Sequence, residues 1–194
     1  MPIKVMAAPK TTQKLLQDGI EKHLAAGLVD ATLAGVEGLA APHRVFHLGL
    51  DQLVAGTPLP KAAKFTGWRA LLVDRKKKAV AAAELAATRA GLRFASVSLG
   101  SHAAGSTAGE AAAERWSRKA KGDYELALLR VPGAYCTALW LRSADGRDDA
   151  FVPIAPCPRA LKPNVAYREK DLRAALLPEA RKQLEGPSEE GGAR

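Results

Sequence analysis

The chain has 194 residues, 47% of them hydrophobic and 25% charged, and it carries a net charge of +9. This is the composition of a globular protein that is long enough to bury a core without disulfide or metal staples, and no run approaches the 18 apolar residues of a membrane helix. Two cysteines, Cys136 and Cys157, suit a reducing compartment, so we expect a cytoplasmic protein with free thiols.

The N-terminal part is predicted to begin with a flexible lead over residues 1–10. A helix over residues 11–26 follows, because leucine and isoleucine recur every four residues along it and Gly27 stops it. The sequence HRVFHL, residues 43–48, favours a strand. Residues 50–55 favour a short helical turn that glycine and proline end.

Residues 67–74 predict a strand, but the segment after it is ambiguous. The sequence AVAAAELAATRA within residues 78–90 has the composition of a helix. Lysines at 76–78 would oppose the dipole at the start of such a helix. We therefore predict a hairpin turn that leads into a strand over residues 78–85, with a helix as the alternative.

Residues 93–99 alternate in polarity and predict another strand. The small residues from Gly100 to Gly109 indicate a loop. Thr107 and Glu110 have the spacing of a capping box, so a helix is expected from there to about residue 120.

The stretch from 122 to 158 predicts three consecutive strands, over residues 124–131, 134–143 and 149–154, with turn residues between them. The middle strand is apolar on both faces, so we expect it at the centre of the sheet. A closing helix over residues 168–185 precedes a disordered polar tail, residues 186–194.

These elements predict an α+β fold. Strands joined by hairpins, with helices at the start, middle and end, favour one domain over residues 11–185. Its mainly antiparallel sheet would have about six strands, with two to three helices packed on it.

A segment with the spacing of a phosphate loop lies between a predicted strand and a predicted helix. Ser106 stands where such loops carry a lysine, which argues against a nucleotide site. The sequence therefore predicts only weak anion binding, by Gly100, Ser101, His102, Gly105, Ser106 and Thr107.

The positive charge is concentrated in residues 61–94, where nine basic side chains stand against two acidic ones. Such a region can bind phosphates or an acidic partner. Its stacking aromatics do not interleave with the basic residues as in RNA-binding signatures. The candidate basic patch comprises Lys61, Lys64, Arg69, Arg75, Lys76, Lys77 and Lys78.

Other chemistries lack the residues they require, so we assign no catalytic group, metal or cofactor. His43 and His47 would lie about 13 Å apart on a strand, too far to share a metal. Cys136 is predicted inside a strand, where a cysteine packs as a small apolar side chain. Asp145, Asp148 and Asp149 are expected at a solvated hairpin tip.

The leading hypothesis is a non-enzymatic protein that binds another protein as an accessory subunit or adaptor, in an unknown process and oligomeric state. One alternative is binding of nucleic acid or another polyanion through residues 61–94. A second alternative is a small hydrolase or transferase that uses residues 100–107, including His102. An exposed apolar patch would favour protein binding, and convergence of the basic side chains would favour polyanion binding.

Overall fold

The computed structural model describes residues 3–4, 8–27, 33, 35–40, 42–99, 101–120 and 122–185. The predicted tail, residues 186–194, lies outside the described residues. Of the predicted flexible lead, Ile3–Lys4 forms a strand, β1, that pairs with β7. The α+β class is confirmed, with more strands and helices in the described part than the sequence predicted.

The described strands form one sheet in the order β10-β9-β8-β7-β3-β4-β5-β6, with β1 on β7 and β2 on β4. Two of the pairings, β1 with β7 and β3 with β7, are parallel and the others antiparallel. The strands after β1 are β2 (Gly38–Leu39), β3 (His43–His47), β4 (Lys64–Val73), β5 (Ala79–Thr88), β6 (Gly91–Leu99), β7 (Tyr124–Val131), β8 (Cys136–Ser143), β9 (Ala150–Pro153) and β10 (Tyr167–Arg168).

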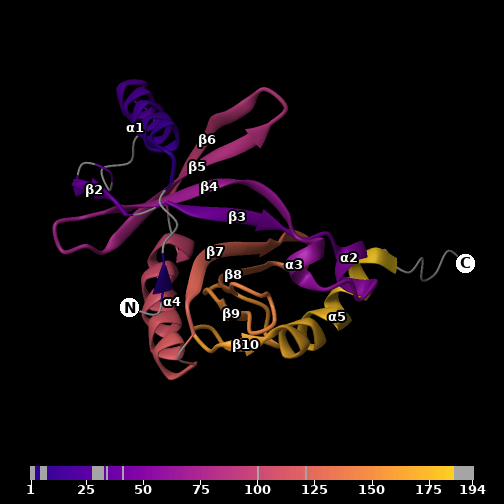
Figure 1. The fold of residues 1–194 in the computed structure, drawn as a ribbon. Coiled ribbons are helices and arrows are strands. Elements are labelled where there is room, and N and C mark those ends of the chain that lie inside the picture. The colour runs from indigo at the N-terminus through magenta and orange to yellow at the C-terminus, as the bar shows by residue number, and fades with distance from the viewer. Residues whose placement is uncertain are drawn as a thin grey trace, which may run out of the picture.

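Helices cover both faces of this sheet (Figure 1). One apolar cluster lies between α1 and the strands β4 to β6, a second between α4 and β7 to β9, and a third beneath α2, α3 and α5. The helices are α1 (Lys10–Ala25), α2 (Leu50–Val54), α3 (Leu59–Ala62), α4 (Ser101–Ala120) and α5 (Glu169–Glu185). No helix in the described ranges combines the length and the apolar character that crossing a membrane requires.

The alanine-rich segment after residue 78 is a strand, which confirms the predicted hairpin. The Asp74 carboxylate accepts hydrogen bonds from the backbone N–H groups of Lys76 and Lys78 at 2.9 Å each, and Lys77 adopts a left-handed φ of 59°. The strand β5 contacts both α1 and α4, and four of its alanines, Ala79, Ala81, Ala82 and Ala83, are buried. Small side chains let both helices approach the strand, and this packing outweighs the helix propensity of alanine.

The ladders on either side of the β4–β5 pair are irregular near Gly67, where the sheet bends. The register shifts between Val45 and Phe46 on β3 and between Glu84 and Leu85 on β5, as bulges do. Gly67 lies between these two irregularities, with a φ of 154°. A Cβ atom there would lie 1.8 Å from the carbonyl oxygen of Leu85, so this position requires glycine.

Helix α4 begins at Ser101, so the loop expected over residues 100–109 and the capping box at Thr107 are wrong. The glycines that indicated a loop are sites of close packing instead. A Cβ atom on Gly105 would lie 2.6 Å from the Ala155 carbonyl oxygen, and one on Gly109 would lie 3.2 Å from Leu139. These glycines let α4 lie directly on β8 and on the segment after β9.

The prediction for β8 is confirmed, because this strand lies between β7 and β9 and is buried on both faces. Trp140 packs toward α5, whereas Leu139 and Leu141 pack toward α4. The closing helix is also confirmed as α5, with Leu172 and Leu176 buried.

Candidate functional site

A partly open cavity of about 350 Å³ is lined by side chains from β4, β5 and β6 and, across β3 in the sheet, from β7 and β8. Two arginines, one glutamate and three hydroxyl groups make up most of its wall. The lining residues are Arg69, Glu84, Ser96, Ser98, Leu99, Arg130 and Thr137.

Two guanidinium groups share one carboxylate in this wall. Arg130 donates to both oxygens of Glu84, with Nη1 2.8 Å from Oε2. Arg69 lies on the other side, with its Nε 3.6 Å from Oε1 of Glu84. The negative charge of Glu110 also acts on Arg69, so the two arginines are balanced by more than Glu84 alone.

Arg69 is buried, with 2% of its surface exposed, although strands of this kind are mostly apolar. Burial is the main cause that lowers the pKa of its guanidinium, followed by an opposing effect of Glu84. Its Nη1 donates to Oγ of Ser106 in α4 at 3.0 Å. Within the described part of the chain, however, nothing accepts a hydrogen bond from its Nε. The Nε instead faces Oε1 of Glu84 at 3.6 Å, an ion pair slightly longer than a hydrogen bond. The cavity wall thus contains a buried cation that Glu84 and Ser106 hold in place.

His43 lies opposite Arg69 in the ladder of β3 and β4, with its Nε2 3.0 Å from Oε1 of Glu110 in α4. The sequence did not indicate this half-buried histidine–carboxylate pair. With the helix expected to begin only near Glu110, nothing placed its carboxylate beside His43. His47 lies at the other end of β3 and lines a separate cavity. Across the described ranges, no three His, Cys, Asp or Glu side chains gather as metal ligands.

That separate cavity, of about 590 Å³, adjoins the first because Arg130 and Thr137 line both. Its other lining residues are His47, Pro132, Tyr135, Cys136, Pro156, Cys157 and Pro158. Burial raises the pKa of Cys136 to about 12 and also raises that of Cys157. Both cysteines are therefore thiols at neutral pH and poor nucleophiles.

The predicted anion-binding residues do not come together as a loop. Gly100 lies outside the described residues, and Ser101 and His102 form the first residues of α4. Gly105 packs against Ala155, and Thr107 is exposed. Ser106 alone of this set is shown to join the cavity, through Arg69.

The predicted basic patch is divided along β4. Arg69 is buried in the middle of this strand, so its assignment to a surface patch is wrong. Lys61 lies in α3 and Lys64 begins β4, whereas Arg75 to Lys78 form the turn beyond the other end of that strand. A strand of ten residues spans about 33 Å, so these two groups of cations do not form one surface.

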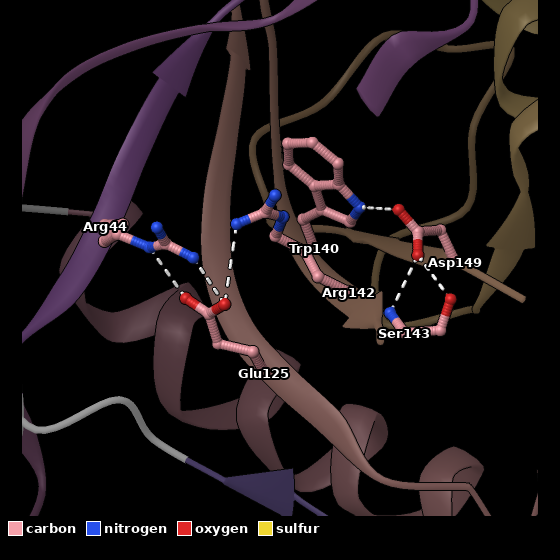
Figure 2. A network of polar contacts seen from close by, with 6 residues as sticks. All are labelled: Arg44, Glu125, Trp140, Arg142, Ser143 and Asp149. Carbon is pink, nitrogen blue, oxygen red and sulfur yellow. Dashed lines mark hydrogen bonds and ion pairs between the residues drawn. The ribbon is translucent and has the colours of Figure 1, made fainter. Parts of the chain in front are cut away.

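A second arrangement of two arginines and a glutamate lies on β3, β7 and β8 (Figure 2). Glu125 accepts hydrogen bonds from Arg44 at 2.7 Å and from Arg142 at 3.5 Å. The Arg142 guanidinium lies 4.8 Å from the ring centroids of both Phe46 and Trp140. These cation–π contacts occupy the faces of the guanidinium, so we interpret this group as structural.

The acidic cluster at the hairpin tip was only partly predicted. Asp145 and Asp148 are exposed as expected, but Asp149 is buried. Its carboxylate accepts the indole N–H of Trp140 at 2.6 Å and both the N–H and the hydroxyl of Ser143 (Figure 2). Asp149 therefore anchors the turn to the core.

The sequence did not indicate Glu84 or Arg130 as site residues. Glu84 is the one charged residue in AVAAAELAAT, and Arg130 is one of two in YELALLRV. These charges within apolar strands are the signal that the sequence offers. A charge within a strand that is otherwise buried needs a partner, but the sequence cannot say which one.

Comparison of the chain with protein-family models, with curated proteins and with solved structures gave no match. The arrangement around Arg69, Glu84 and Arg130 is therefore the basis on which we argue the function.

Proposed function

We propose that this protein binds a small anionic ligand, of the phosphate or carboxylate class, in the cavity lined by Arg69, Glu84 and Arg130. The observation that carries this proposal is the convergence of two arginines and three hydroxyl side chains on the wall of one cavity, around the shared carboxylate of Glu84. Guanidinium groups bind oxyanions through paired charge-assisted hydrogen bonds. The hydroxyl groups of the lining residues add further donors for the remaining oxygens.

A purely structural role for the three charged groups is the main alternative. Buried arginine–glutamate groups occur as part of protein cores and contribute little net stability there. The group around Glu84 differs from the one around Glu125, because it faces a cavity and no aromatic ring of the described residues lies over its guanidinium groups. This difference supports a ligand site at Glu84 and a structural role at Glu125.

Isothermal titration with inorganic phosphate at low ionic strength tests the proposal. We expect one site per chain, and a loss of affinity of about tenfold or more in Arg130→Met, since a hydrogen bond between charged groups contributes about 1.5–3 kcal/mol. Arg44→Met is the matched control, because it removes an arginine of the second group and should leave the affinity unchanged. Absence of a phosphate site in the wild type, or equal affinity in both variants, would leave only the structural role.

The affinity for sulfate is expected to increase as the pH falls below 6.5. Burial lowers the pKa of His47 from 6.5, and the nearby Arg130 lowers it further, while Glu84 raises it. A bound anion near Arg130 would favour the imidazolium form, so binding takes up a proton. Lys64, which pairs with His47 in the ladder, is exposed.

Sulfate stays doubly charged over this range, so titration against pH measures the protein's own protons. His47→Gln should make the affinity independent of pH between 5.5 and 7.5, roughly one unit on either side of the ordinary histidine pKa. Without an anion, the same lowered pKa predicts that stability falls as the pH drops below 6.5, because the unfolded chain takes up the proton first. An unchanged pH dependence in His47→Gln would contradict this assignment.

The outer edge of β6 is a candidate surface for a second function, binding of another protein. This strand ends the sheet order within the described residues, and most of its side chains are exposed. Its sequence GLRFASVSL has neither the lysine nor the proline that commonly protect strand edges. We propose pairing with β6 of a second copy, measured by sedimentation velocity and hydrogen exchange. Monomers at all concentrations, with β6 exchange independent of concentration, would exclude it.

A further inference from the structure

We propose that the ligand of this site is an anion attached to an apolar ring, with the ring in the adjoining cavity beside Tyr135. This inference rests on the proposed function, because it places the charged part of the ligand in the cavity lined by Arg69, Glu84 and Arg130. It adds the class of ligand, which phosphate binding alone does not define.

The two cavities adjoin at two lining residues that they share, and they differ in character. Arg130 and Thr137 line both, so a ligand bound at Arg130 lies at the entrance to the second cavity. Beyond Arg130, that cavity presents three prolines, a tyrosine ring and two thiols. Sites for small molecules are typically largely apolar, with a few polar groups that fix the orientation, and have volumes of about 300–1,000 Å³. The adjoining cavities have this composition and size.

Charge is confined to one end of the adjoining cavities. Burial holds Cys136 and Cys157 as neutral thiols and favours neutral His47, so Arg130 is the charged group of the second cavity at neutral pH. An anion would therefore bind at the arginine end and leave its uncharged part in the second cavity. This polarity gives the ligand a defined direction.

Tyr135 is the residue that the apolar part would contact most directly. It is 73% exposed, and its φ of 50° lies in the left-handed region, which is unfavourable for a tyrosine. A short 3-10 turn over Pro132–Ala134 holds it between β7 and β8. An exposed aromatic ring in a strained conformation beside a cavity is typical of a binding position. The strand predicted over residues 134–143 therefore begins later than expected, at Cys136, and Tyr135 lies outside it.

Titration with three probes tests this inference: inorganic phosphate, methyl phosphate and phenyl phosphate. We expect phenyl phosphate to bind about tenfold more tightly than methyl phosphate, since burying one face of a ring against Tyr135 and the prolines removes apolar surface from water. Tyr135→Ser should abolish this tenfold difference and leave the affinity for inorganic phosphate unchanged. Tyr135→Phe is the matched control and should retain the preference.

The outcomes separate the two proposals. If phosphate binds but the phenyl and methyl esters bind equally, the ring-binding inference is wrong and anion binding stands. If the preference for phenyl phosphate persists in Tyr135→Ser, the assignment of the second cavity is wrong. If none of the three probes binds, the anion site itself is refuted.

Discussion

Replacing Glu84 with glutamine is expected to lower the free energy of unfolding by about 3–5 kcal/mol, the typical cost of removing one partner from a buried ion pair. The substitution preserves the shape of the side chain, so it creates no cavity. It leaves the buried guanidinium of Arg69 facing Arg130 without the carboxylate that separates them. Repulsion and incomplete solvation then act together on the folded state.

Urea denaturation with and without phosphate measures this effect. Phosphate should recover part of the lost stability, because an anion that binds the folded state alone stabilises it by mass action. Glu125→Gln is the control: its arginine partners are about one quarter exposed, so we expect a smaller loss that phosphate does not recover. Equal losses in both variants, each insensitive to phosphate, would contradict the role assigned to Glu84.

Replacing Gly67 with alanine is expected to lower the free energy of unfolding by more than about 4 kcal/mol. Losses of this size are found only for severe defects of the backbone or the core. The new Cβ atom would lie 1.8 Å from the carbonyl oxygen of Leu85 and 3.2 Å from Cα of Ala86, so β4 and β5 would have to separate. The positive φ at this position adds strain for any residue with a side chain.

Thermal or urea denaturation measures this loss, and Gly35→Ala is the control. A Cβ atom at Gly35 would meet no atom within 4 Å, so its stability should change by less than about 0.5 kcal/mol, as is usual at surface positions. If Gly67→Ala unfolds at the same urea concentration as the wild type, the sheet does not require the bend that we describe.

Much of the fold was predictable because its signals are local. The turn at Asp74 depends on one side chain and two nearby N–H groups, so the hairpin before β5 could be expected despite the alanine-rich sequence. The buried pattern of β8 follows from its own alternation. In both cases the information lies within about ten residues of the chain.

The start of α4 and the cavity depend on distant contacts instead. The glycine at position 105 does not mark a loop. It lies within a helix where Ala155 occupies the space of a side chain, and no local pattern shows this contact. The cavity requires Glu84 and Arg130 to meet, although they are 46 positions apart and on strands that are not neighbours. Their meeting depends on the bulges and on Gly67, whose effect on register the sequence does not reveal.

The parallel ladder of β3 and β7 joins two antiparallel runs of strands, β3 to β6 and β7 to β10. Arg69, Glu84 and the two cavity serines belong to the first run, whereas Arg130 and Thr137 belong to the second. A ligand that contacts both arginines therefore binds across this ladder, and its affinity depends on the angle between the two runs. Binding and the twist of the sheet are then thermodynamically linked, so a substitution that alters the twist changes affinity without touching the ligand.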